Sequence, residues 1–193
     1  MNFHQSLVIT PEGTPNPNTL KFEINRVLCE TGSANFPDAA SAARSELAKA
    51  VFAVANVESV LIGKNFISVT KLGCADWQAI KQPVVEAIRH ILAVGKSAVD
   101  STSATCGDST SAAESDADRE IIGRIKEILD NEIRPALAMD GGDVTFVGYA
   151  QGIVKLRLQG SCRHCPSATM TLKLGVESRL RSLIPAIQEV VAV

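Results

Sequence analysis

The chain has 193 residues, enough for one mid-sized domain or two small ones, and its 46% apolar but only 4% aromatic residues require an aliphatic core. A formal net charge of −2 and a pI of about 5.9 argue against a nucleic-acid-binding protein with a broad basic face. No apolar run approaches the roughly 20 residues of a membrane-spanning helix.

The first ten residues carry no Lys or Arg and no long apolar block. They predict neither a secretory signal nor, with the first arginine at Arg26, a transit peptide. Five cysteines occur: Cys29, Cys74, Cys106, Cys162 and Cys165. An odd, sparse set without a signal peptide argues against a disulfide framework and indicates a reducing compartment. We expect a cytoplasmic, bacterial-type location, or the mitochondrial matrix only if a leader has been removed.

Composition changes abruptly in the middle of the chain. Residues 97–118 contain six Ser, three Thr and five Ala, and their four Asp and one Glu, without any Lys or Arg, give a charge of −5. Such a stretch has almost nothing to bury, so it predicts a flexible acidic linker between one domain at residues 1–96 and another at 119–193. Each domain is near the lower size limit for a stable core, so oligomerisation or a bound metal would help the smaller one.

The first domain mixes strand and helix patterns. We predict strands at 6–10, 19–24, 57–62 and 66–70, a turn-rich loop at 11–18, and helices at 39–54 and 76–94. Asp76 is the expected N-cap of the last helix, and Phe22 and Trp77 are expected in the core. The Thr14–Asn18 part of the loop is a candidate for a partner contact, although a rigid loop structure explains it equally well.

The second domain is predicted in the order helix, strand, strand, helix, strand. Asp118 is the expected N-cap of its first helix, which Pro135 ends or kinks. A turn is predicted at 140–143, strands at 144–147, 153–158 and 190–193, and a helix from Pro166 to about Leu183. Together, the two regions predict an α+β protein of two small mixed domains.

Cys162 and Cys165 are a closely spaced pair between a predicted strand and a predicted helix. Both thiols can point to the same side of a tight turn, which suits half of a zinc site, a dithiol redox couple or half of an iron–sulfur site. A closed metal site needs about four protein donors, and two copies related by a two-fold axis would supply them. The following helix N-terminus and Arg163 favour thiolates, whereas His164 is expected at the surface.

The pair is embedded in several motifs: Ile133-Arg134-Pro135-Ala136, Asp140-Gly141-Gly142-Asp143, Gly160-Ser161-Cys162, Cys165-Pro166-Ser167, Thr171-Leu172-Lys173 and Gly175-Val176-Glu177. In this combination they resemble the NifU C-terminal (Nfu) domain of iron–sulfur cluster carriers. The segment from Thr14 to Phe22, TPNPNTLKF, is similar to the domain that precedes it in one branch of the family. The family usually has small residues between the cysteines, where this chain has Arg163 and His164.

The resemblance implies a carrier or scaffold that is not an enzyme. A [4Fe–4S] cluster, or a [2Fe–2S] form, would be held between two subunits by Cys162 and Cys165 of each. The implied partners are a second copy, an upstream assembly scaffold and apo iron–sulfur client proteins, with neither nucleic acid nor membrane among them.

Two other functions fit the same pair. A thioredoxin-like dithiol oxidoreductase also places two cysteines between a strand and a helix, although this domain is short for that fold and its element order differs. A structural zinc-bridged dimer would use the same four thiolates. Asp140 and Asp143 are expected to form a turn rather than to act as catalytic acids, and Lys173 and Arg179 to lie on a solvated helix face.

Overall fold

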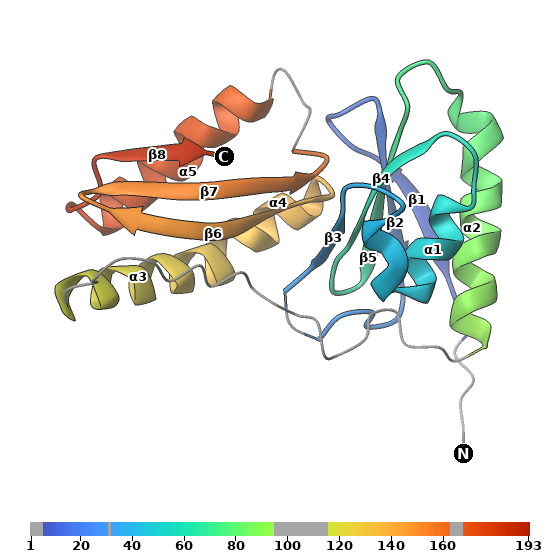
Figure 1. Ribbon diagram of the computed structural model, residues 1–193, viewed down its shortest axis with the longest axis horizontal. Coiled ribbons are helices and arrows are strands. Elements are labelled where there is room, and N and C mark those ends of the chain that lie inside the picture. Colours follow the sequence, from blue (N-terminus) through green and yellow to red (C-terminus); the bar gives the residue numbers. More distant parts are fainter. Residues whose placement is uncertain (1–5, 31, 95–115, 163–167) are drawn as a thin grey trace. The chain divides into compact units, whose positions relative to one another are not determined.

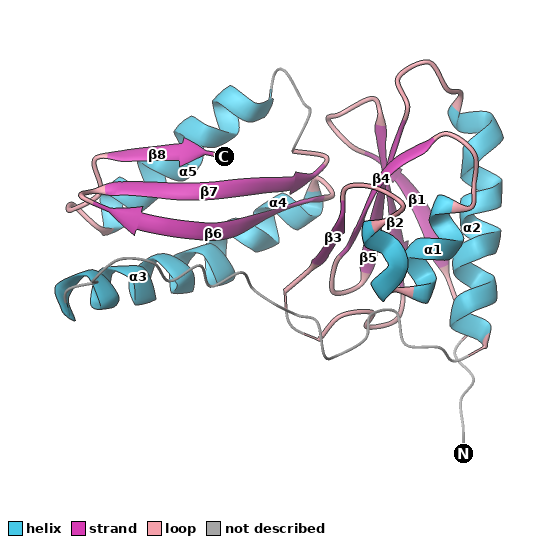
Figure 2. Ribbon diagram, viewed as in Figure 1, coloured by secondary structure: helices cyan, strands magenta, loops and turns pink. Residues whose placement is uncertain are grey.

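A computed structural model of the protein describes residues 6–30, 32–94, 116–162 and 168–193. The chain divides into two compact units, with the boundary between Ala104 and Thr105 (Figure 1). Most of the predicted linker lies outside the described residues, and its last three residues, from Asp116, already belong to a helix. Both units mix helices and strands, so the predicted α+β class is confirmed (Figure 2).

The N-terminal unit is a five-stranded antiparallel sheet with its helices on one face (Figure 1). Its elements are β1 (Ile9–Gly13), β2 (Thr19–Ile24), β3 (Ala34–Phe36), the 3-10 helix η1 (Ser41–Arg44), α1 (Glu46–Phe52), β4 (Val57–Ile62), β5 (Phe66–Lys71) and α2 (Trp77–Ala93). The strand order is β1-β2-β5-β4-β3. The core joins alternate strand residues such as Phe22 and Ile67 to helix residues such as Leu47 and Ile88.

Several predicted elements of this unit are confirmed. Strand β2 has the predicted bounds, the β4–β5 hairpin turns at residues 63–65, and Asp76 caps α2 by accepting the Gln78 N–H at 3.0 Å. Phe22 is fully buried as predicted, whereas Trp77 is half-buried and packs against the edge of the core.

Other predictions for this unit are wrong. The first strand lies at Ile9–Gly13 rather than at 6–10, and it runs through Pro11 because an edge strand tolerates a missing N–H. The helix predicted at 39–54 is divided at Ser45, whose backbone is extended (φ −141°, ψ 117°) and whose Oγ accepts the Ala48 N–H at 3.1 Å. Ser45 is therefore the N-cap of a separate, shorter helix. The short strand β3 was not predicted.

The C-terminal unit is a three-stranded sheet packed against helices. Its elements are α3 (Asp116–Ile128), the π-helical η3 (Leu129–Ile133), α4 (Arg134–Met139), β6 (Gly142–Ala150), β7 (Ile153–Gly160), α5 (Ala168–Leu183) and β8 (Glu189–Ala192). Strand β7 is central, antiparallel to β6 and parallel to β8. The predicted element order is confirmed, including the hairpin turn at Gln151 and Gly152, where φ is 50° and 81°.

Three predictions in this unit need correction. The first helix begins at Asp116, so Asp118 lies inside it. Of the two alternatives for Pro135, an end of the helix is wrong, because α4 continues past it to Met139; a kink is not contradicted, since the regular α-helix is interrupted by the π-helical segment directly before it. The turn is shorter than predicted, since β6 already begins at Gly142. No helix within the described ranges has the length and apolar character that a bilayer crossing requires.

Candidate functional site

Cys162 lies two residues beyond the end of β7. The strand ends at Gly160, where φ is 64°, a left-handed conformation that favours glycine. The Cys162 side chain is 4% exposed and packs with the apolar core of the unit. Cys165, like Arg163, His164 and Pro166, lies outside the described residues. Cys162 is therefore the half of the predicted pair that the structure places.

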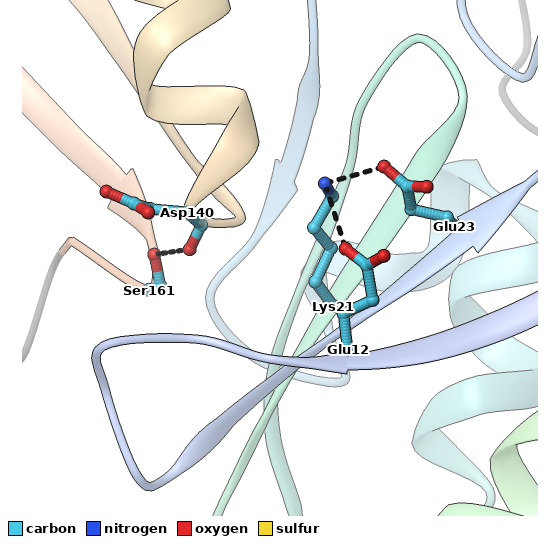
Figure 3. A network of polar contacts seen from close by, with 5 residues as sticks. All are labelled: Glu12, Lys21, Glu23, Asp140 and Ser161. Carbon is cyan, nitrogen blue, oxygen red and sulfur yellow. Dashed lines mark hydrogen bonds and ion pairs between the residues drawn. The ribbon is translucent and has the colours of Figure 1, made fainter.

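The turn at Asp140 and Gly141 holds the backbone that carries Cys162 (Figure 3). The Ser161 hydroxyl donates to the Asp140 carbonyl oxygen at 2.6 Å, and the Ser161 N–H donates to the Gly141 carbonyl oxygen at 3.2 Å. The two segments meet because Gly142 and Gly160 face each other where β6 and β7 begin to pair. Ser161 Oγ is also 3.8 Å from Cys162 Sγ. Two motifs that are distant in sequence thus form one site.

The two glycines of the turn have different roles. Gly141 has a φ of 72°, which a side chain would strain. A Cβ at Gly142 would overlap Cys162 Sγ and come within 3.3 Å of the Gln159 carbonyl oxygen. Gly142 therefore leaves the space that the thiol occupies. The sequence analysis treated this glycine only as part of a turn.

An ion pair joins α4 to β6 beside this turn. Asp143 is 5% exposed, and its Oδ1 lies 3.5 Å from Arg134 Nε. Arg134 Nε also donates to the Val144 carbonyl oxygen at 3.1 Å, and Nη1 lies 3.0 Å from Asp130 Oδ1. Asp143 is thus a buried, charge-paired residue and not only a turn former, a role that the sequence analysis missed.

The chemistry of this site rests on sulfur. A cysteine thiolate binds both zinc and iron–sulfur clusters, so the donor type fits either cargo. Within the described ranges, no three His, Cys, Asp or Glu side chains converge as metal ligands. Cys162 alone cannot close a four-coordinate site, which needs further donors.

Comparison with known proteins places both units in one family. A model described as NifU-like domain matches residues 125–191, and one described as scaffold protein Nfu/NifU N terminal matches residues 9–95. The human (Homo sapiens) protein named NFU1 iron-sulfur cluster scaffold homolog, mitochondrial, is 40% identical over 185 residues, which cover 95% of this chain and 71% of that protein. This chain belongs to the Nfu/NifU family.

The chain is similar to two further proteins. NifU-like protein 5, mitochondrial, from Arabidopsis thaliana is 37% identical over 188 residues, covering 96% of this chain and 68% of its own length. The solution NMR structure of a NifU-like protein from Saccharomyces cerevisiae has a TM-score of 0.47 and 26% identity, and covers 52% of this chain and 91% of its own. The predicted family resemblance is confirmed for both domains.

The remaining candidate residues of this Nfu/NifU chain lie away from Cys162 or cannot be placed. Cys29 is half-buried and Cys74 is exposed, both in the N-terminal unit, and Cys106 is outside the described residues. Arg179 is exposed, as predicted, but its Nε lies 2.6 Å from Glu132 Oε2. This hydrogen bond lowers the pKa of the Glu132 carboxyl and raises the pKa of the Arg179 guanidinium. The Lys173 side chain lies outside the described part.

Proposed function

We propose that this Nfu/NifU protein is a scaffold and carrier of iron–sulfur clusters rather than an enzyme. It would hold a [4Fe–4S] cluster between two copies of the chain and transfer the cluster to apo-proteins during iron–sulfur cluster assembly. The observation that carries the proposal is the position of Cys162, which Gly142 and Ser161 hold at the end of β7. The family supports the same function, since the human relative is named as an iron–sulfur cluster scaffold.

The number of donors supports a cluster shared by two subunits. Cys162 and Cys165 give two thiolates per chain, and an iron–sulfur cluster needs about four. A second copy related by a two-fold axis supplies the other two. A [2Fe–2S] cluster could use the same four sulfurs, so the [4Fe–4S] type is itself part of what we propose. Sharing also favours transfer, because each subunit has few bonds to give up.

Burial of Cys162 adds one requirement to this proposal. The side chain is 4% exposed, so either the sulfur or the residues that cover it have to move before it can bind a cluster. The neighbouring backbone is held by two hydrogen bonds from Ser161, to the carbonyl oxygens of Asp140 and Gly141. A small displacement of this turn would expose the thiol while the sheet beneath it stays intact. The turn at Asp140 would thereby influence how readily the cluster is bound and released.

Anaerobic reconstitution with iron and sulfide tests the proposal. The full chain should form a brown dimer with about four iron and four sulfide per two chains, as Mössbauer spectroscopy and intact-complex mass measurement would show. Cys162→Ser and Cys165→Ser should each lose most of this iron. Cys74→Ser, which changes an exposed cysteine of the N-terminal unit, is the matched control and should keep it.

Three outcomes would contradict the proposal. A fully loaded monomer would remove the need for a second copy. Zinc in protein purified without air would favour the structural zinc dimer. Insulin reduction that disappears in the Cys165→Ser variant would favour the dithiol oxidoreductase.

The partners, the linker and the compartment are part of the same proposal. The partners are a second copy, an upstream scaffold and apo client proteins. Limited proteolysis should cut first within residues 97–118, separating fragments of about 1–96 and 119–193. We propose a reducing, bacterial-type cytoplasm as the compartment, with the mitochondrial matrix as the alternative because both named relatives are called mitochondrial. Cell fractionation would distinguish the two.

A further inference from the structure

Two buried lysines of the N-terminal unit have different surroundings. Lys21, 6% exposed, lies with its Nζ 2.8 Å from Glu23 Oε1 and 3.5 Å from Glu12 Oε2 (Figure 3). Lys71, 7% exposed, forms no ion pair with any residue that the structure describes. A buried ammonium group without a carboxylate is unfavourable, because nothing of opposite charge offsets its lost hydration.

Neutral groups surround the Lys71 ammonium. Its Nζ donates to Asn18 Oδ1 at 3.1 Å and to the Gly73 carbonyl oxygen at 3.3 Å, and it lies 6.0 Å from the centre of the Trp77 ring. An ammonium group has three N–H bonds, so one has no acceptor among the described residues. The acid nearest in sequence, Asp76, uses its Oδ1 to cap α2. The Lys71 ammonium therefore has a positive charge and one N–H that could bind an additional acceptor.

Exposed apolar residues lie in the loop and the strand end that supply the neighbours of this ammonium. We define the Lys71 patch as the Lys71 ammonium together with Pro15, Pro17, Leu72 and Trp77. Leu72 is 44% exposed, both prolines are exposed, and Trp77 is half-buried. The Trp77 indole N–H donates to the Pro17 carbonyl oxygen at 3.0 Å, which holds the ring against the loop. Tryptophan is enriched at protein interfaces, so a partly exposed Trp77 beside other exposed apolar residues suits a surface that binds a partner.

The loop that carries the two prolines is fixed by its own side chains. Thr14 Oγ1 lies 3.0 Å from the carbonyl oxygens of Asn16 and Thr19, to which it can donate. Asn16 is 3% exposed, and its Oδ1 accepts the Asn18 N–H at 3.0 Å. A surface that is already rigid loses little conformational entropy on binding. The Lys71 patch is thus preorganised for a partner. Stability of the loop alone does not explain why an ammonium group without a carboxylate lies beside it.

We propose that the Lys71 patch is a docking surface for a protein segment that carries an Asp or Glu carboxylate among apolar side chains. The carboxylate would accept the remaining N–H of Lys71 and supply the negative charge that the described residues lack. The apolar side chains of the segment would cover Leu72 and the Trp77 ring. This gives the N-terminal unit a recognition role that is separate from cluster binding at Cys162.

Random peptides displayed on phage and selected against the full chain provide the test. We expect the enriched peptides to contain Asp or Glu flanked by apolar residues. Trp77 is the one tryptophan of the sequence, so binding should change its fluorescence and can be titrated directly. Lys71→Met should weaken binding roughly tenfold to a hundredfold, as should changing the peptide acid to its amide.

Two further variants keep the result interpretable. Lys64→Met removes the same charge from an exposed position in the β4–β5 turn and should bind like the unmodified chain. Leu72→Ser changes an exposed residue, so it should fold normally and still weaken binding severalfold. All variants should keep the iron content of reconstituted protein, so a failure here leaves the cluster proposal intact.

The proposal is overturned if the enriched peptides lack acidic residues, or if neither Lys71→Met nor Leu72→Ser weakens their binding. Enrichment no greater than on the Lys71→Met variant would also overturn it. Self-association of the full chain that Lys71→Met abolishes would assign the patch to a second copy instead.

Discussion

One turn in each unit is held by specific hydrogen bonds, and these two turns are held in different ways. In the N-terminal unit, Thr14 and Asn16 hold the Thr14–Asn18 loop through bonds to its own backbone, and Lys71 and Trp77 add bonds from β5 and α2. In the C-terminal unit, the Cys162 turn is held from outside, by the Asp140–Gly141 turn and by the space at Gly142. A loop with internal bonds of its own keeps its surface even if one neighbour moves, whereas a turn held by a neighbour can change when that neighbour moves. The first arrangement suits recognition and the second suits binding and release of a cargo.

The largest expected effect tests the outside support of the Cys162 turn. Asp143→Ala removes the buried partner of Arg134 and should lower the stability of the C-terminal unit by about 2–3 kcal/mol, less than for a fully buried pair because Arg134 is 25% exposed. Hydrogen exchange of β6 and β7 peptides would measure the loss, and reconstituted iron should fall with it. Trp77 fluorescence, which reports the N-terminal unit, should keep its unfolding midpoint. An equal loss of stability in both units would contradict the expectation that the two units unfold independently.

A second prediction concerns the space for the thiol. Gly142→Ala should displace the Cys162 sulfur and lower the free energy of unfolding by about 1–3 kcal/mol. The iron content of reconstituted protein should fall further than the loss of folded protein alone would cause. Gly148→Ala is the matched control in the same strand, because a Cβ there meets nothing within 4 Å. Thermal unfolding and iron analysis of both variants give the comparison. If the two variants retain the same iron, Gly142 does not position the thiol.

A third prediction tests the loop that is held from within. Asn16→Ala removes the acceptor for the Asn18 N–H and should destabilise the N-terminal unit by about 1–2 kcal/mol. The midpoint followed by Trp77 fluorescence should fall, and binding of acidic peptides should weaken. Reconstituted iron should stay the same. Iron loss in this variant would mean that the two turns depend on each other.

Regular patterns made much of the fold predictable. Alternating apolar residues define β2, and turn residues define both the β4–β5 and the β6–β7 hairpins. The three residues of β3 are too few to show alternation, and Ser45 divides a helix whose apolar spacing looks continuous. At Pro135 the error is reversed: the sequence suggests that the helix ends, but the helix continues, because a proline is tolerated in the first turn of α4, after the π-helical segment.

The sequence predicts the ligand chemistry of the candidate site, but not the contacts that hold Cys162 in place. The spacing of Cys162 and Cys165 indicates a sulfur ligand pair without any structure. The contact between Gly142 and the Cys162 thiol, and the pairing of Arg134 with Asp143, depend on which strands and helices lie side by side. Local sequence carries no direct signal for such contacts. The first depends on the register of β6 with β7, and the second on the packing of α4 beside β6.

The smallest expected effect concerns an exposed pair that should matter to neither turn. Arg179 lowers the pKa of Glu132 by hydrogen bonding, so Glu132 stabilises the folded chain above the ordinary glutamate pKa, and this contribution is lost as pH falls through its lower folded value. Arg179→Gln should therefore lower the unfolding midpoint slightly at neutral pH and low salt, and have no effect in acid or high salt. Glu132→Gln is the matched partner, and the double variant should be no less stable than either single one. Iron content should not change, because this pair is on the exposed surface and supports stability without touching the thiol. A persistent effect in high salt would mean that the pair acts through packing rather than through charge.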